Sequence, residues 1–412
     1  MFKYLIRLAS ICFWLVIILG SLYTANYLTQ NISEPKAINI FTWVDMINRE
    51  SVSEFEQQTG IKVNLSYFSN AEELLTKLRL TNSQDYDLIV TNDYAIESLI
   101  KHDLVQKIDH TKLNFWSQID PNLLNFYYDP KNLYSIPFYW DIYGLGYVTE
   151  NLGQKHHQQN LQNLISDNHT PALKVKLNTG NILDTPELSW GLVFNSAHNS
   201  QNNLSTARPE PRSPRASVEG GMLRVPNSQI AMLDNGLEAV LCAGQYLFGS
   251  SDSLQPAQLP KIRTLLIQQK NFITAYTDEK AGFLLAAGDV QLAVTQSAFI
   301  HRVIKRQPEI KFGIPKEGGF MVVDAFVISK YSTKLDWVYK FLNFIYQPKF
   351  IDQTVTQFAY LPVLTSSLQQ ADLNYLGGFD KLFKQDFKKL QFFKRNLPLQ
   401  EVNKIWVDVK AA

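Results

Sequence analysis

Apolar and polar positions alternate with short, regular periods after residue 36, which predicts a succession of strands and helices. The predicted elements are strands at 37–42, 62–68 and 87–90, a helix at 51–60, and a helix that carries Leu74, Leu75 and Leu78. Gly60 ends the first helix, and Ser69 and Glu72 have capping-box spacing before the second. This β-α-β-α-β order predicts a parallel sheet covered by helices. Ligands bind such sheets beyond the carboxyl ends of the strands, so Trp43 and residues 91–94 lie at the expected edge.

The C-terminal half carries a second set of periodic segments. They are a capped helix at 233–247, a strand and turn at 288–299, a strand at 320–328, a helix at 336–346 ended by Pro348, and an amphipathic segment at 379–409. Between the two sets, residues 155–219 are rich in Asn, Gln, Ser and His and contain the run STARPEPRSPRASVEG. This composition predicts a flexible, solvated insertion, because it lacks the apolar content of a core.

The N-terminus has the pattern of an export signal. Lys3 and Arg7 precede residues 8–33, which carry no charge and include the run LASICFWLVIILGSLYTA. The cleavage site is poor, and the apolar stretch is long enough to span a bilayer if it is kept. Residues 1–30 are therefore predicted to be a cleaved signal or a membrane anchor. In both cases the rest of the chain is expected outside the cytoplasm, in the periplasm or held at the inner membrane.

Composition narrows the class of protein. The chain has 412 residues, 45% of them hydrophobic, which is enough for two domains with their own cores. A net charge of +1 gives no electrostatic footprint for nucleic acid. The two cysteines cannot build a disulfide framework, and Cys242 lies in an apolar helix, where it is predicted to be buried.

Motifs for catalysis and cofactor binding are absent from the sequence. It contains no GxxxxGK[ST], GxGxxG, GxSxG or HExxH pattern, and its His residues have no partner at useful spacing. We therefore expect no cofactor, no metal and no enzymatic activity. An exported α/β chain of this kind is more often a binding protein than an enzyme.

Six segments in register resemble one known family. They are INIFTWVDMI, FEQQTGIKVNLSYFSNAEELLTKL, DYDLIVTNDYAIESLIKHDLVQKIDHTKL, YSIPFYWDIYGLGY, FGIPKEGGFMVVDAFVIS and KFLNFIYQPKF. They are similar to the periplasmic solute-binding proteins of bacterial polyamine ABC transporters. The resemblance implies the two-lobed α/β fold of type II periplasmic binding proteins, with two crossovers between the lobes. Lobe 1 would comprise 37–141 and 323–368, and lobe 2 would comprise 142–322 and 369–412, with 155–219 as an insertion.

The resemblance also implies a ligand site between the lobes. The residues carried over, or standing at the matching positions, are Trp43, Asn92, Asp93, Tyr94, Asp141, Asn235, Glu238, Asp324 and Tyr360. An extended cation needs carboxylates at its ammonium groups and aromatic faces along its methylenes. Asp324 interrupts the apolar run FMVVDAFVI, where a carboxylate without a cationic partner would be expensive. Asp141 replaces a family glycine, and Val322 replaces a family tryptophan.

Two of these assignments have structural alternatives. Asp93 could pair with an amine or cap the next helix, and Asn235 and Glu238 also have capping-box spacing. The leading hypothesis is a receptor that delivers putrescine or spermidine to the permease subunits of an ABC transporter. The alternatives are a receptor for another small cationic solute and a membrane-anchored sensor or scaffold that has lost polyamine binding. Nucleic acid is not expected as a partner.

Overall fold

The computed structural model describes residues 36–81, 84–148, 188–198 and 230–412, together with residues 7, 10, 13–21 and 24. The strands are β1 (Ala37–Thr42), β2 (Lys62–Tyr67), β3 (Leu88–Asn92), β4 (Ser135–Val148), β5 (Ile230–Met232), β6 (Ile273–Tyr276), β7 (Leu292–Gln296), β8 (Ile310–Gly313), β9 (Phe320–Ile328), β10 (Leu361–Pro362) and β11 (Gln391–Phe392). The helices are α2 (Arg49–Thr59), α3 (Ala71–Leu80), α4 (Asp93–Lys101), α7 (Gly191–His198), α8 (Gly236–Phe248), α9 (Leu259–Gln269), α10 (Ala281–Ala287), α11 (Ser297–Ile304), α12 (Leu335–Ile345), α13 (Pro348–Phe358), α14 (Thr365–Gln370), α15 (Phe379–Lys381) and α16 (Leu399–Ala411).

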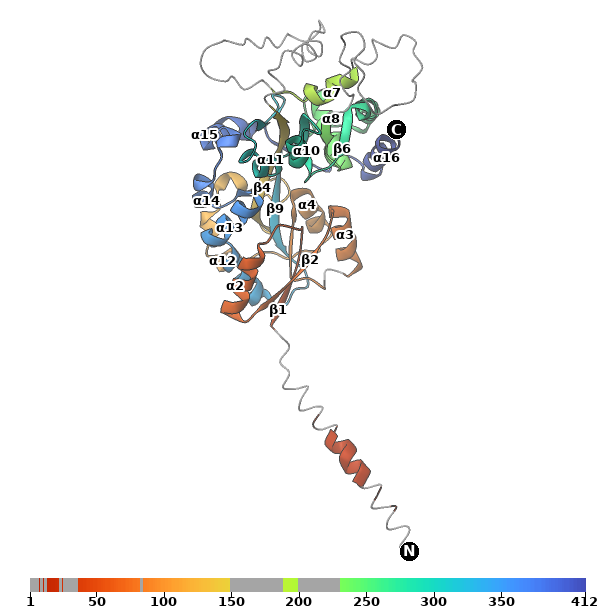
Figure 1. The fold of residues 1–412 in the computed structure, drawn as a ribbon. Helices are drawn as coiled ribbons and strands as arrows, with labels where there is room; N and C mark the ends of the chain where they lie inside the picture. Colours follow the sequence, from red (N-terminus) through yellow and green to blue (C-terminus); the bar gives the residue numbers. More distant parts are fainter. Residues whose placement is uncertain are drawn as a thin grey trace.

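In the part of the chain that is described, eleven strands join into one sheet with the central order β2-β1-β3-β9-β4-β7-β5-β6. β1 runs parallel to β2 and β3, and β5 runs parallel to β6 and β7. The long strands β4 and β9 pair antiparallel between these two parallel units. Figure 1 shows the result as two bodies: lobe 1 contains β1 to β3, and lobe 2 contains β5 to β7. β4 and β9 run from one lobe into the other.

The residues that begin and end the first helices agree with the sequence prediction, except that the cap of α3 lies one residue later. Gly60 ends α2 at φ 69°, a conformation that glycine adopts without strain. Asn70, rather than Ser69, caps α3, because its Oδ1 accepts from the backbone N of Glu73 at 2.8 Å. Glu73 in turn accepts from the backbone N of Ser69 at 2.8 Å. The cap is therefore one residue later than predicted, and the Glu73 side chain bonds to the residue before the cap and not to Asn70 itself.

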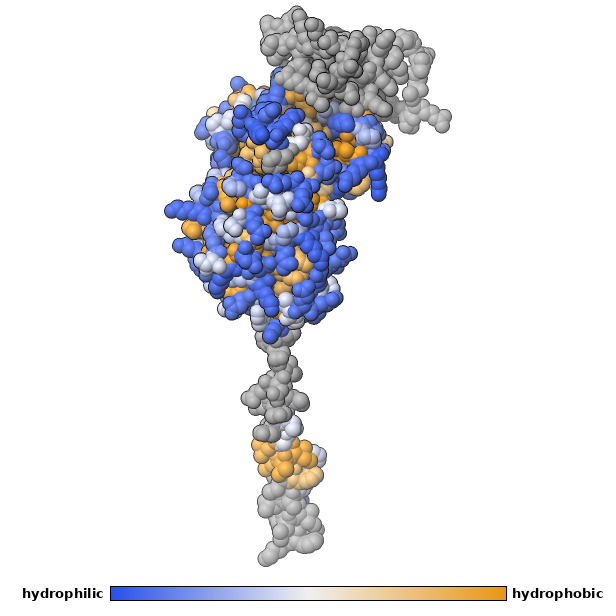
Figure 2. Space-filling model, turned by 90° about the vertical axis from the view of Figure 1, so that its left-hand side faces the viewer, coloured by the Kyte–Doolittle hydropathy of each residue, from blue (hydrophilic) through white to orange (hydrophobic). Residues whose placement is uncertain are grey.

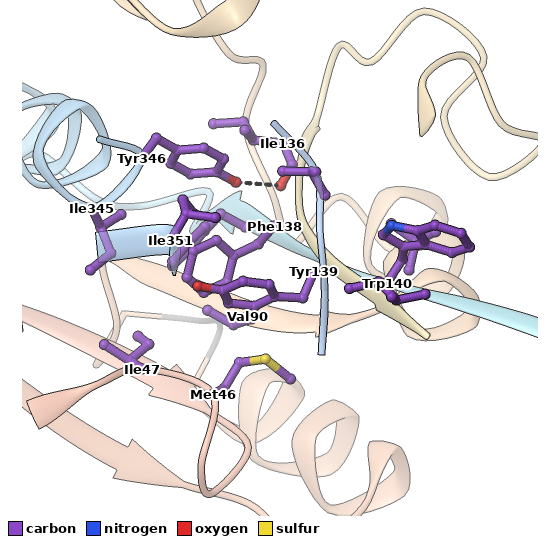
Figure 3. Packing of buried hydrophobic residues seen from close by; sticks show 14 of the residues in the cluster. Met46, Ile47, Val90, Ile136, Phe138, Tyr139, Trp140, Ile345, Tyr346 and Ile351 are labelled. Carbon is purple, nitrogen blue, oxygen red and sulfur yellow. Dashed lines mark hydrogen bonds between the residues drawn. The ribbon is translucent and has the colours of Figure 1, made fainter. Parts of the chain in front are cut away.

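β4 carries a bulge just before it enters lobe 2. At Phe138 two residues of β4 oppose one residue of β9, and the rings of Phe138 and Tyr139 lie 4.1 Å apart (Figure 3). The hydroxyl of Tyr346 donates to Ile136 O at 3.1 Å and holds the start of the bulge. One extra residue reverses the faces of all later side chains. The bulge thus fixes the side of the sheet on which Asp141 lies.

Residues 188–194 are part of the lobe 2 core. Trp190 and Phe194 are fully buried, and the indole N–H of Trp190 donates to Gly318 O at 2.8 Å. The backbone N of Lys316 donates to Leu188 O at 2.8 Å, so this segment packs on the loop that leads into β9. The flexible insertion predicted over 155–219 is therefore wrong for 188–198, which form α7 and the approach to it. The rest of the range lies outside the described residues.

Gly318 is the one glycine in this loop that must be glycine on two grounds. Its φ is 103°, and a Cβ there would lie 2.5 Å from Lys389 O.

Two further predictions concern single residues. Pro348, which was predicted to end the helix before it, is also the first residue of the next helix, α13. Cys242 is fully buried, as predicted.

The outer surface carries no large apolar patch in the view of Figure 2, where hydrophilic residues dominate both lobes. The orange segment near the N-terminus is the helical stretch 13–21, whose apolar side chains are exposed. Within the residues that are described, no helix combines the length and the apolar character needed to cross a membrane. Most of the expected signal or anchor lies outside the described residues.

Candidate functional site

The lobe 1 part of the site lies where β3 passes into α4. Asn92 caps α4, since its Oδ1 accepts from the backbone N of Ala95 at 3.3 Å. Asp93 is the first residue of the helix and is 1% exposed. The hydroxyl of Tyr127 donates to Asp93 Oδ2 at 3.5 Å, whereas Oδ1 has no partner among the described residues. The structure gives the capping role to Asn92 and leaves the Asp93 carboxylate available.

Asp324 stands at the middle of β9, between Asn92 of β3 and Tyr139 of β4. Burial raises the pKa of Asp324 to about 7, a hydrogen bond from Trp43 opposes the shift, and the charge of Asp141 adds to it. Trp43 follows β1 directly, at the sheet edge where the sequence pattern placed it. Asp324 and Trp43 therefore meet although 281 positions separate them in the sequence.

Asp141 lies on β4 and is 2% exposed. Its carboxylate accepts from the hydroxyl of Ser297 and from the backbone N of Ala298 at 3.2 Å, at the start of α11. Burial raises the pKa of Asp141 to about 6, and these hydrogen bonds oppose the shift. Asp141 lies on strand β4 but caps the N-terminus of helix α11, so only part of its hydrogen-bonding capacity remains for a ligand.

The lobe 2 part of the site lies at the start of α8. Asn235 caps this helix by accepting from the backbone N of Leu237 at 3.0 Å and of Glu238 at 3.3 Å. Glu238 is 5% exposed. Burial raises the pKa of Glu238 well above its ordinary value, and the charges of Asp278 and Asp93 add to the shift. The capping box is therefore incomplete, and Glu238 faces other carboxylates.

Five carboxylates are linked by their charges, each affecting the pKa of a neighbour, and we call them the acid row. Its members, in order of neighbours, are Asp278, Glu238, Asp93, Asp324 and Asp141. Burial raises the pKa of Asp93 well above its ordinary value, and the charge of Asp324 adds to this. None of the five forms an ion pair with a Lys or Arg in the described part of the chain. Asp93, Asp141 and Glu238 are buried, and Asp278 and Asp324 are partly buried. A charged carboxylate held out of water without a cation is costly, which agrees with the raised pKa values of the row.

Two of the expected aromatic contacts already carry a cation of the protein itself. The guanidinium of Arg395 lies 4.9 Å from the ring centroid of Tyr94, and that of Arg302 lies 5.8 Å from that of Tyr360. Trp43, which is half-buried beside Asp324, is the remaining expected aromatic residue. Among the described residues, no group of three or more His, Cys, Asp or Glu side chains is arranged to hold a metal ion.

Three residues of this region escaped the sequence analysis: Asp278, Arg302 and Arg395. Burial raises the pKa of Asp278 to about 6, with the charge of Asp234 as a further cause. The arginines had no local signal, because their partners are remote in sequence. Arg395 pairs with Glu72 at 2.8 Å across 323 positions.

Comparison with known proteins gives the family. The sequence profile of the bacterial extracellular solute-binding proteins matches residues 50–379. A putrescine-binding periplasmic protein of Pseudomonas aeruginosa (strain UCBPP-PA14) is 25% identical over 325 residues, 77% of this chain and 75% of that protein. A putrescine-binding periplasmic protein of Escherichia coli (strain K12) is 26% identical over the same share of each chain.

Solved structures agree on the architecture. The spermidine/putrescine ABC transporter substrate-binding protein of Streptococcus pneumoniae has a TM-score of 0.65 and 19% identity, and the match covers 91% of this chain and 99% of that one. This likeness confirms the two-lobed α/β fold expected from the sequence. The exact division of the chain between the lobes stays a prediction. With the profile covering most of its length, the chain belongs to the bacterial extracellular solute-binding protein family.

Proposed function

We propose that this protein is an extracytoplasmic receptor for polyamines, such as putrescine and spermidine, which it delivers to an ABC permease. The acid row carries the proposal, because three of its carboxylates are buried, two are partly buried, and none forms an ion pair with Lys or Arg in the described part of the chain. Ammonium groups spaced along one ligand would supply the missing charges through strong, charge-assisted hydrogen bonds. Relatives named as putrescine-binding proteins support the same ligand class.

Each site residue has a separate role in this proposal. Asp93, Glu238 and Asp324 accept from the ammonium groups, and Trp43 covers the methylenes. Asn92 and Asn235 act indirectly, since they cap α4 and α8 and thereby place the neighbouring carboxylates. Asp141 contributes charge from the crossover strand, and Tyr94 and Tyr360 line the site with one face covered by arginine.

The placement of the acids links binding to a change of shape. Asp93 belongs to lobe 1 and Glu238 to lobe 2, so a ligand with two charged ends bridges the lobes. Such a ligand gains its second ion pair only when the lobes are closed, and it therefore shifts the population toward closure. The permease would recognise the closed form. The chain acts in this proposal by binding and not by catalysis.

The proposed location follows from the sequence and from the relatives, which are periplasmic proteins by name. We place the two lobes in the periplasm. Residues 1–30 would either be removed after export or keep the receptor at the inner membrane. Mass spectrometry of the protein recovered from membrane and periplasmic fractions distinguishes the two forms by the mass of the N-terminal segment.

Calorimetry of the purified protein against putrescine, spermidine and spermine tests the function. We expect binding of at least one polyamine and, by small-angle scattering, a smaller radius of gyration at saturation. A response only to another cationic solute would change the ligand class. No response to any cation, with an intact fold, would favour the sensor or scaffold. An unchanged radius at saturating polyamine would contradict delivery by closure.

A further inference from the structure

A lysine close to the end of the chain lies at the carboxyl edge of the lobe 2 sheet. β5 ends at Met232 and the parallel strand β6 ends at Tyr276, and the backbone N of Thr277 donates to Met232 O at 2.8 Å. Asp234 follows β5 closely, and Lys410 of α16 forms an ion pair with its carboxylate. Parallel sheets bind ligands beyond this edge, so the Lys410 ammonium occupies a place suited to a ligand.

The side chains of Asp234, Tyr276 and Trp406 surround that ammonium, and we call them the ammonium box. The Nζ of Lys410 lies 4.0 Å from the ring centroid of Tyr276 and 4.9 Å from that of Trp406. The two rings meet edge to face, with their centroids 5.2 Å apart. Both distances from Nζ are within the range of cation–π attraction, and Asp234 accepts a charge-assisted hydrogen bond. One carboxylate and two ring faces are the chemistry that recognises an alkylammonium group.

The ammonium box adjoins the start of α8, where the lobe 2 part of the candidate site lies. Asp234 directly precedes Asn235, the cap of this helix. Trp406 packs on Gly236, since a Cβ at Gly236 would lie 2.8 Å from the Cβ of Trp406. The backbone N of Asp234 donates to Oδ1 of Asp278, a member of the acid row, at 3.2 Å. The box and the acid row are therefore neighbours that share a hydrogen bond.

The helix that carries Lys410 and Trp406 is held in place without the Lys410 ammonium. The apolar face of α16 is buried. Arg263 pairs with Asp408 at 2.6 Å, and Lys270 Nζ donates to the backbone O of Lys410 at 2.6 Å. The side chain of Lys410 is 37% exposed. Its ammonium can therefore turn out into water while α16 keeps Trp406 at the box.

We infer that the ammonium box is a second ammonium-binding site, filled by Lys410 in this structure and open to the terminal ammonium of a polyamine that replaces Lys410. The side chain of lysine is a four-carbon stem that ends in an ammonium group. It thus has the chemistry of one end of putrescine, or of the aminobutyl end of spermidine. The inference rests on the proposed polyamine function for the class of ligand, and it adds a site that shares none of the ligand residues assigned there.

Lys410 acts in this inference as a competitor that belongs to the chain. A ligand that enters the box replaces one ion pair and two cation–π contacts, each of them modest at a partly exposed position. An ammonium group on a ligand that the acid row already holds competes at a high effective concentration, whereas a free monoamine does not. Lys410 would therefore exclude single cations from the box and give way to polyamines.

Calorimetry of the full chain with spermidine and with n-butylammonium tests the inference. Lys410→Ala opens the box, so affinity for spermidine should rise about fivefold or more, and n-butylammonium should bind more tightly than to the wild type. Adding Asp234→Asn to Lys410→Ala should remove both gains. Lys410→Arg keeps a cation in the box and should keep the wild-type affinities. Lys404→Ala removes the same charge from an exposed position of α16 and is the matched control.

The wild type offers a second readout, which needs no substitution in the box. Partial acetylation with acetic anhydride, followed by mass spectrometry of peptides, measures how accessible each lysine ammonium is. Saturating spermidine should raise the acetylation of Lys410 relative to that of Lys404 about threefold or more, because the displaced ammonium lies in water. The ratio between two lysines of one helix corrects for reagent that the polyamine itself consumes.

Spermidine binding without a gain in Lys410→Ala, an equal gain in Lys404→Ala, or an unchanged acetylation ratio would overturn the inference and leave the polyamine function standing. Absence of polyamine binding to the wild type and to Lys410→Ala would overturn the proposed function. The box is then judged by n-butylammonium alone. Binding to Lys410→Ala that Asp234→Asn abolishes would support the box, and absence of such binding would refute it.

Discussion

Asp129 and Asp93 are two aspartates of lobe 1 with nearly equal burial, 4% and 1% exposed, in opposite surroundings. Asp129 accepts from the backbone N–H groups of residues 133–135 and from the hydroxyl of Ser135, all at 2.8–2.9 Å. Asp93 accepts one long hydrogen bond, from Tyr127, and its second oxygen has no partner among the described residues. The first carboxylate completes a turn, whereas the second keeps one oxygen unpaired among the described residues, as expected for the proposed ligand contact.

Asp87 resembles Asp129, because its buried carboxylate also has several partners within the chain. It accepts from Asn39 N at 2.8 Å and from the hydroxyl of Ser332 at 2.8 Å, and it pairs with Lys334 at 3.1 Å. Nearly all buried polar groups in native proteins have such partners, so the exceptions need an explanation. The comparison teaches that burial alone does not single out a candidate site residue, whereas a buried carboxylate with an unpaired oxygen, such as Asp93, is a candidate.

The largest effect is expected at Asp129. Asp129→Ala removes the acceptor of four hydrogen bonds and leaves buried N–H groups unpaired, so the free energy of unfolding should fall by about 3–5 kcal/mol. Asp93→Ala is the matched variant and should cost far less stability, because it also removes an unfavourable buried charge. Chemical denaturation of both proteins measures the difference, and equal losses would break the comparison.

The opposite pattern is expected for ligand binding at Asp324. Asp324→Asn keeps the shape of the side chain but loses the charge that pairs with an ammonium group. Affinity for putrescine should fall by at least about thirtyfold, while the fold stays stable. Calorimetry at constant pH measures this change. Affinity within a factor of three of the wild type would remove Asp324 from the site.

The acid row also predicts opposite pH responses with and without ligand. Burial raises the pKa of Asp324 to about 7 and of Asp141 to about 6, above the ordinary 3.8, so the ligand-free fold holds extra protons between these values. Its stability should therefore fall as the pH rises from about 4 to 7. Ammonium groups need deprotonated carboxylates, so affinity for putrescine should rise about tenfold over pH 5.5–7.5. Thermal unfolding and calorimetry in matched buffers measure both trends, and parallel trends would contradict the assignment.

Substitution of Asp141 should have the smallest effect on stability and on affinity. Its carboxylate is intermediate between those with several partners in the chain, such as Asp129, and those with few, such as Asp93. It belongs to the acid row but already accepts from Ser297 and Ala298. Asp141→Asn keeps a capping oxygen, so stability should change by less than about 1 kcal/mol and affinity by only a few-fold. A loss as large as that of Asp324→Asn would place Asp141 in direct contact with the ligand.

Local pattern predicted the elements of the fold well wherever neighbours in sequence decide the outcome. The strands at 37–42 and 320–328 have the bounds that the pattern gave, and Gly60 ends its helix as expected. The failure at 188–198 has a physical reason, because five apolar residues within positions 188–194 were outweighed in the sequence pattern by the polar residues around them. Their burial depends on the loop at 316–318, which no local rule connects to them.

The site divides in the same way. Asp324 was singled out from the sequence because it is a charge within an apolar run, and the structure places it beside Trp43, while its role as a ligand contact stays a prediction. The role of Asn235 as a cap was also indicated by spacing. The cap of α4 was considered only for Asp93, whereas the structure gives this role to Asn92. The contact of Arg395 with the ring of Tyr94 could not be predicted from the sequence, because the two residues are 301 positions apart and only the fold brings them together. A proline at 137 inside a buried strand was a signal for the bulge, since proline cannot complete a sheet ladder.

The position of two acids on the crossover strands has a mechanical consequence. Asp141 lies on β4 and Asp324 on β9, the two strands that join the lobes. In the proposed closure, repulsion between these two carboxylates therefore acts at the strands about which the lobes turn and not at the far rims of the lobes. A cationic ligand that neutralises the repulsion would then alter the preferred angle between the lobes directly. The same two strands, β4 and β9, would then both sense the charge of the ligand and transmit its binding to the angle between the lobes.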